Sequence, residues 1–196
     1  MVVLVSGRGT NLQAVIDHCK NSPIAEIVEV ISDKPDAKGL DRAMRAGIKT
    51  TKLPHPSDKT TRNAELLKRL EELNPDLIVL AGYMRIVPKE IVDRFYGKMI
   101  NIHPSLLPSF PGLEAQQQAL DYGVKVTGCT VHFVDPEVDS GPVILQHSVP
   151  VENQETLKNL SDRILGYEHQ ILTRAVDLFC NDKLRIVGRK VEILEK

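Results

Sequence analysis

The sequence of 196 residues contains no tryptophan, and aromatic residues make up only 4% of it. It also lacks an excess of either charge, since 25 basic and 26 acidic side chains leave a formal net charge of −1. Single-stranded nucleic acids bind on aromatic platforms, and phosphate backbones and anionic lipid surfaces attract proteins with a positive charge. We therefore expect neither a nucleic acid partner nor a membrane partner.

Cysteine is scarce, and the three cysteines, Cys19, Cys129 and Cys180, form no CxxC pair. An odd number of separated thiols is a poor disulfide framework, which favours a reducing, cytoplasmic compartment. The six histidines show no HxxxH or HExxH spacing, so we expect no metal site. The longest apolar run, residues 77–84, is far shorter than the ~18 residues that span a bilayer.

Short apolar segments alternate with amphipathic ones along the first two thirds of the chain. Nearly all-apolar strands that alternate with helices are typical of a parallel sheet covered on both faces. The segments predicted as strands are 2–5, 27–31, 49–53, 77–81 and 98–102, and the predicted helices are 12–19, 40–46, 61–73, 88–95 and 112–122.

The last third of the chain has a different pattern. Segments 124–134 and 143–149 alternate more clearly between apolar and polar residues, which predicts antiparallel strands. A long helix is predicted over 154–179, and a closing hairpin over 184–193. We therefore predict an α/β fold with a doubly wound, Rossmann-like, mostly parallel sheet, antiparallel C-terminal additions and a long C-terminal helix.

The first predicted strand leads into a glycine-rich turn, SGRGTN, at residues 6–11. Gly7 and Gly9 permit a tight turn, and Thr10 or Asn11 can cap the helix that follows. The free amides at the start of a helix favour an anion such as phosphate. The turn therefore predicts an anion-binding site, with a helix cap that binds no ligand as the alternative.

A dinucleotide site is a further alternative for the same turn. The fingerprint GxGxxG needs a small sixth residue, and this sequence has Leu12 there. Asp33, near the end of the second predicted strand, could nevertheless act as the acidic residue of that fingerprint. No GK[ST] follows the turn, which excludes a P-loop.

The fifth predicted strand ends in the segment NIHPSLLPSFP. Asn101 and His103 are two residues apart in a strand, so their side chains leave the same face. Pro104 favours an extended backbone at His103, and Pro108 and Pro111 stiffen the loop beyond. An amide beside an imidazole can polarise a carbonyl group and stabilise an oxyanion. A turn-capping asparagine beside a solvated histidine is the alternative.

Three carboxylates, Asp135, Glu137 and Asp139, lie in the turn-rich segment 135–142. A carboxylate beside His103 would raise the pKa of the imidazole and fix its tautomer, as a proton donor near pH 7 requires. The spacing does not show which of the three carboxylates is that partner. A solvated acidic turn or a Ca²⁺-like loop is the alternative.

Five segments, in chain order, closely resemble the phosphoribosylglycinamide formyltransferase family of folate-dependent enzymes: SGRGTNLQAVID, AGYMRIV, NIHPSLLPSFPGLEA, TGCTVHFVDPEVDSGPVILQ and YEHQIL. The resemblance implies direct transfer of a formyl group from the co-substrate 10-formyltetrahydrofolate to the amine of phosphoribosylglycinamide, in purine biosynthesis. It further implies one formyltransferase domain over 1–196, with a phosphate-binding half at 1–100 and a catalytic and folate-binding half at 101–196.

The resemblance also implies a role for each matching residue. Asn101, His103 and Asp139 would be catalytic. The ribonucleotide would bind to Gly9, Thr10, Asn11 and Glu168. The folate would bind to Arg62, Met84, Arg85, Ile86, Val87, Asn101, Asp135, Pro136, Glu137, Val138 and Asp139.

The sequence departs from the family pattern at a few positions. Thr10 stands where serine is common, which keeps the hydroxyl, and Leu165 replaces a glutamine that some members carry. The alternatives are a formyltetrahydrofolate hydrolase or another formyltetrahydrofolate-using transferase, and a non-catalytic nucleotide- or folate-binding sensor domain. We expect small-molecule substrates and a monomer or homodimer.

Overall fold

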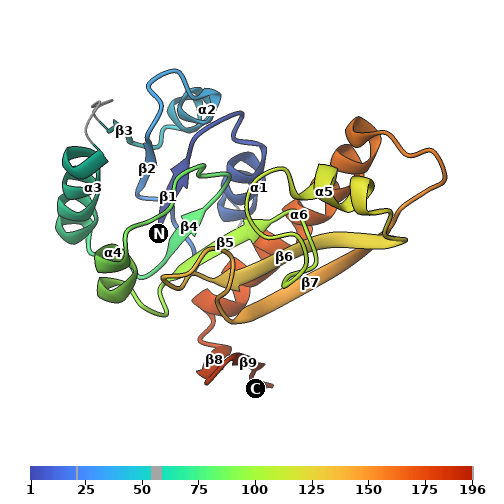
Figure 1. Ribbon diagram of the computed structural model, residues 1–196. Helices are drawn as coiled ribbons and strands as arrows, with labels where there is room; N and C mark the ends of the chain where they lie inside the picture. The colour runs from blue at the N-terminus through green and yellow to red at the C-terminus, as the bar shows by residue number, and fades with distance from the viewer. Residues whose placement is uncertain (21, 54–58, 196) are drawn as a thin grey trace. The chain divides into compact units, whose positions relative to one another are not determined.

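The computed structural model describes residues 1–20, 22–53 and 59–195, which form six α-helices and nine β-strands (Figure 1). The chain divides into two compact units, Met1–Ile100 and Asn101–Lys196. Within the described residues, no helix combines the length and the apolar character needed to cross a membrane.

The first unit is built on parallel strands in the order β3-β2-β1-β4. Val2 of β1 lies opposite Glu29 of β2 and Ile78 of β4, and all residues of these three strands are buried. The strands are β1 (Val2–Val5), β2 (Glu29–Ser32), β3 (Thr50–Lys52) and β4 (Ile78–Leu80). The helices are α1 (Thr10–Cys19), α2 (Lys38–Arg45), α3 (Lys59–Leu73) and α4 (Lys89–Arg94).

Because these strands are parallel, their carboxyl ends meet at one edge of the sheet, where α/β proteins build their binding sites. Ser6 follows β1, Asp33 follows β2, and the segment 81–87 follows β4. The first predicted turn and the predicted folate loop therefore lie at the same edge of this unit.

The second unit has its strands in the order β5-β6-β7-β9-β8. Strands β6 and β7 pair antiparallel, β9 runs parallel to β7, and β8 and β9 form an antiparallel hairpin. Helix α6 packs against β6 and β7 (Figure 1). The elements are β5 (Met99–His103), whose first two residues belong to the first unit, α5 (Ala115–Tyr122), β6 (Val126–Phe133), β7 (Val143–Pro150), α6 (Leu157–Cys180), β8 (Leu184–Val187) and β9 (Lys190–Ile193).

The fold class predicted from the sequence is confirmed, and the predicted helices and strands differ from the observed ones at their ends. Helix α6 begins at Leu157, later than predicted, because Gln154 has a left-handed backbone (φ 59°) and Thr156 caps the helix by accepting from Asn159 N at 3.2 Å. The prediction that Thr10 or Asn11 caps α1 is wrong. The N-cap is Gly9, with φ 70° and no side-chain hydrogen bond.

Candidate active site

Asn101 and His103 on β5 both contact Asp139. The Nδ2 atom of Asn101 lies 3.4 Å from Asp139 Oδ1, and Nδ1 of His103 lies 3.2 Å from Asp139 Oδ2. Both side chains therefore leave the same face of the strand, as predicted. His103 is buried, with 4% of its surface exposed. The structure brings together three groups that lie far apart in the sequence.

The conformation of the loop 135–142 selects Asp139 rather than its neighbours as the partner of His103. Asp139 has a left-handed backbone, with φ 52°. The side chain of Asp135 is instead occupied within the loop, where it accepts from Ser140 Oγ at 2.5 Å and from Glu137 N at 3.2 Å. A Cβ atom at Gly141 would overlap the carbonyl oxygen of Phe133, which explains the glycine of the DSGP segment.

The two ring nitrogens of His103 face two acceptors. Nε2 lies 2.9 Å from the carbonyl oxygen of Phe110, and Nδ1 lies beside the carboxylate of Asp139. A doubly protonated imidazolium would donate to both. Burial nevertheless lowers the pKa of His103, and the charge of Asp139 and the carbonyl of Phe110 only partly oppose that effect. The expectation that a neighbouring carboxylate raises the pKa of His103 above its ordinary value is wrong. The carboxylate of Asp139 does act to raise it, but the effect of burial is larger.

Asp139 is held in its ionised form. Burial by itself would raise the pKa of its carboxyl group. The side chain of His132, whose Nε2 lies 3.7 Å from Asp139 Oδ1, the backbone N–H of Gly112 at 2.8 Å and the charge of His103 together bring that pKa below its ordinary value of 3.8. A carboxylate is therefore present beside His103 at neutral pH.

His132, on β6, is a member of this cluster that the sequence reasoning missed. Its Nδ1 donates to the carbonyl of Phe133 at 2.9 Å, which leaves Nε2 to accept a hydrogen bond. That atom lies 3.2 Å from Asn101 Nδ2 and accepts from it, which fixes the orientation of the amide. The sequence feature that could have identified His132 is the two-residue period of β6. It places Thr130 and His132, both buried and polar, on one face of the strand.

The loop that follows His103 is held in place by β6 and β7. Thr130 Oγ1 donates to the carbonyl of Ser105 at 2.7 Å and accepts from Leu107 N at 3.1 Å. Gln146 Nε2 donates to the carbonyl of Leu107 at 2.9 Å. These bonds fix the strand exit from which Asn101 and His103 project.

In the first unit, the glycine-rich turn after β1 packs closely on α2. Gly39 N donates to the carbonyl of Gly7 at 3.0 Å, and Arg42 Nε donates to the carbonyl of Arg8 at 2.9 Å. A Cβ atom at Gly9 would lie 2.5 Å from the Cα atom of Gly39. Only glycine fits at this contact, and the first amides of α1 keep the arrangement that favours an anion.

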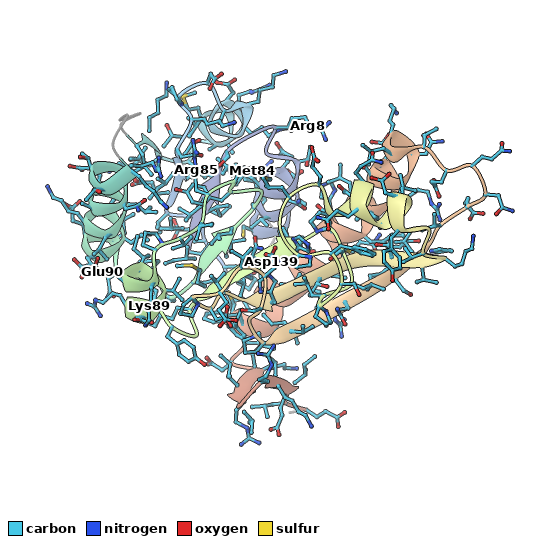
Figure 2. All side chains as sticks on the ribbon, in the orientation of Figure 1. Arg8, Met84, Arg85, Lys89, Glu90 and Asp139 are labelled. Atoms are coloured by element: carbon cyan, nitrogen blue, oxygen red, sulfur yellow. The ribbon has the colours of Figure 1, made fainter. Side chains whose placement is uncertain are left out.

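The predicted folate residues of the first unit lie on the loop after β4 and on α3. Met84 and Ile86 are 58% and 62% exposed, and Arg85 follows Met84 in the same loop (Figure 2). Burial, together with the charge of Asp33, raises the pKa of Tyr83 to about 12. The guanidinium groups of Arg62 and Arg85 oppose this rise, which places both near Tyr83.

The other predicted binding residues lie in the second unit. Glu168 is buried on α6. Asp135, Pro136, Glu137 and Val138 precede Asp139 in the loop between β6 and β7, and Val138 is half exposed. Among the described residues, no group of three or more histidine, cysteine or acidic side chains could hold a metal ion.

An amide donor, an imidazole and an ionised carboxylate within hydrogen-bonding distance define a site for general acid–base chemistry at a carbonyl group. The chain belongs to the formyl transferase family, whose model matches residues 1–176. The resemblance seen in the sequence is therefore confirmed.

Relatives and solved structures agree with this assignment. The chain is 42% identical over 189 residues to phosphoribosylglycinamide formyltransferase of Escherichia coli, covering 95% of this chain and 89% of that protein. It is 46% identical over 189 residues to the trifunctional purine biosynthetic protein adenosine-3 of Bos taurus, covering 95% of this chain but only 19% of that protein. The chain thus spans about a fifth of such trifunctional relatives.

Among solved structures, glycinamide ribonucleotide transformylase 1 of Symbiobacterium toebii superimposes with a TM-score of 0.95 and 50% identity. The match covers 99% of this chain and 93% of that one.

Proposed function

We propose that the protein transfers the formyl group of 10-formyltetrahydrofolate to the amine of 5′-phosphoribosylglycinamide, a step of purine biosynthesis. The observation that carries this proposal is the contact of Asn101 and His103 with Asp139 in a chain of the formyl transferase family. The names of the relatives in Escherichia coli and Symbiobacterium toebii support the choice of the acceptor.

The binding residues divide between the two substrates. The phosphate of the ribonucleotide binds to the turn formed by Gly9, Thr10 and Asn11, and Glu168 accepts from a ribose hydroxyl. The folate binds to the loop after β4, to Arg62 and to the loop 135–139, largely through backbone groups. The exposure of Met84, Ile86 and Val138, all apolar side chains, supports these two loops as ligand surfaces.

In the reaction, the amine of the glycinamide attacks the formyl carbon and a tetrahedral oxyanion forms. Asn101 donates a hydrogen bond to the oxyanion, and protonated His103 stabilises it. When the intermediate collapses, the bond from carbon to folate N10 breaks and His103 delivers a proton to N10. Asp139 takes the proton that the attacking amine releases, through water, and returns it to His103, so that the proton balance closes.

The low pKa of His103 fits this role. A buried imidazole that is mostly neutral at pH 7 becomes a strong acid once it is protonated. The ionised Asp139 beside it is the group from which it can regain its proton within the cycle.

A steady-state assay tests the proposal. Purified protein is mixed with 10-formyltetrahydrofolate, with or without phosphoribosylglycinamide, and tetrahydrofolate, formylated ribonucleotide and formate are measured. The proposal requires formylated ribonucleotide that depends on the acceptor. Formate released without the ribonucleotide would show a hydrolase, and binding of both ligands without turnover would show a sensor domain.

Inorganic phosphate tests the assignment of the first turn. It should compete with the ribonucleotide and not with the folate, because only the ribonucleotide carries a phosphate for that turn. Competition with the folate alone would contradict the assignment.

The remaining expectations belong to the same proposal. They are a single domain, a cytoplasmic location, a monomeric or homodimeric state, the absence of a nucleic acid partner and a reaction without a metal ion. Sedimentation of the purified protein would decide its oligomeric state.

A further inference from the structure

Asp33, which follows β2, has both carboxylate oxygens engaged inside the protein. Oδ1 accepts from Ser6 Oγ at 2.5 Å, and Oδ2 accepts from Arg85 Nε at 2.7 Å. The side chain of Asp33 is fully buried. It is therefore not available to bind the ribose of a dinucleotide, the alternative role that the sequence left open for it.

Ser6 connects the carboxylate of Asp33 to the loop after β4. While its hydroxyl donates to Asp33, the same oxygen accepts from the backbone N–H of Met84 at 2.8 Å. Its own N–H donates to the carbonyl of Gly82 at 3.1 Å. The loop after β4 is thus anchored at two points, at Met84 through Ser6 and at Arg85 directly. Both contacts depend on the buried carboxylate of Asp33.

The anchor also determines what Arg85 offers to a ligand. Its Nε donates to Asp33, and its side chain is 41% exposed. The Nε–H of the guanidinium is therefore already used within the protein, while the side chains of Met84 and Ile86 are exposed beside it.

We propose that Asp33 is a positioning residue for the folate-binding loop, and that Arg85 supports folate binding through its contact with Asp33 rather than by pairing with the glutamate carboxylates of the folate. This inference rests on the proposed function. It requires an aspartate, because in an asparagine an NH2 group, which only donates, would replace one of the two oxygens that accept from Ser6 and Arg85.

The test compares Asp33→Asn and Arg85→Met with a matched control, Glu29→Gln. Glu29 lies at the opposite end of β2 from Asp33, and its side chain is also fully buried and paired with an arginine, Arg69, at 2.8 Å. Both carboxylate-to-amide changes remove a buried charge pair, so both should lower the melting temperature. Only the change at Asp33 should alter folate binding.

Two stable folate analogues serve as probes, one with the glutamate and one in which a simple amide replaces it. We expect Asp33→Asn and Arg85→Met each to raise the Kd of both analogues about five- to tenfold. The double variant should be no worse than either single variant, because both remove the same contact. Glu29→Gln should leave both Kd values unchanged, and no variant should change the KM of the ribonucleotide more than about twofold.

Two results would overturn the inference. One is an Arg85→Met defect that disappears with the amide analogue, which would mean that the guanidinium binds the glutamate. The other is an Asp33→Asn variant that resembles Glu29→Gln in losing stability alone. If Asp33→Asn does not fold, the Kd values of the two analogues for Arg85→Met still show whether the guanidinium binds the glutamate.

The proposed function can fail separately. A wild-type protein that binds the analogues but transfers no formyl group would refute the formyl transfer, and the Kd values would still decide the role of Asp33. A wild-type protein that binds neither analogue would refute both.

Discussion

Replacing Asp139 with asparagine removes one negative charge from the site and preserves the shape of the loop. Asp139 has a left-handed backbone, with φ 52°. That conformation costs most residues about 1–2 kcal/mol, and asparagine is among the few that tolerate it. The amide oxygen of the new residue can still accept from Gly112 N, now at 2.8 Å. Asp139→Asn therefore tests the charge rather than the fold.

The expected loss follows from what the carboxylate contacts. Without it, the proton released by the amine has no acceptor beside His103, and loss of acid–base catalysis lowers kcat about 10²- to 10⁴-fold. The charge of Asp139 also partly opposes the effect of burial on the pKa of His103. Its removal lowers that pKa further, so the alkaline limb of the kcat profile, which follows loss of protonated His103, moves to lower pH. The acid limb that follows protonation of Asp139 disappears.

The assay is kcat and kcat/KM across the pH range in which the protein stays folded, with the Kd of a folate analogue measured alongside. Asp135→Asn is the comparison, because Asp135 lies on the same loop and its side chain accepts from Ser140 and Glu137 within that loop. It should change folate affinity and leave both limbs in place. A pH profile of Asp139→Asn that matches the wild type would exclude Asp139 from the proton chemistry.

The same variant has a signature in stability. The pKa of Asp139 is lower in the folded protein than its ordinary value of 3.8. Its carboxylate therefore stabilises the fold above that value, and the contribution is lost as the pH falls through the lowered pKa. Wild type and Asp139→Asn should differ in free energy of unfolding near neutral pH and converge in acid. A difference that persists at low pH would contradict the direction of this shift.

Three further changes test other parts of the site. Asn101→Ala should lower kcat about 10²- to 10³-fold, because an oxyanion donor is lost, and a loss below tenfold in a kinetic assay would refute that role. Gly9→Ala should raise the KM of the ribonucleotide and spare that of the folate, since its Cβ would lie 2.5 Å from the α2 backbone. Gly47→Ala, with the same left-handed strain but open space, should change only thermal stability. Arg189→Met, which removes the 2.9 Å bond to the carbonyl of Ser140, should lower kcat about two- to fivefold; unchanged kinetics would show that the C-terminal hairpin does not position this loop.

Local patterns predicted those features of the fold that depend on neighbours in the sequence. The apolar run at residues 2–5 became β1 as predicted, and the hairpin through Gly188 has strands on both sides of that turn. The two-residue spacing of Asn101 and His103 placed them on one face because a strand alternates with a period of two. The ends of helices were less accurate, since a left-handed residue such as Glu114 (φ 58°) has no pattern in the sequence that marks it.

Features that depend on contacts across the fold could not be read in advance. The residues alone left Asp135, Glu137 and Asp139 equivalent as partners of His103. The choice is set by the left-handed backbone at Asp139 and by the bond between Ser140 and Asp135. The direction of the pKa of His103 was also missed, because it depends on how deeply the ring is buried.

The two N–H groups of the Asn101 amide have unequal partners, and this difference favours catalysis in the proposed reaction. One is held by His132 Nε2 at 3.2 Å, which directs the nitrogen rather than the oxygen into the site. The other faces Asp139 Oδ1 at 3.4 Å, the long end of hydrogen-bond distances, so the bond is weak. A developing oxyanion can take over this second N–H at little cost. The donor is thus oriented before the substrate binds, yet its full strength is used only as charge forms on the formyl oxygen, and an interaction that is stronger in the transition state than in the ground state raises kcat.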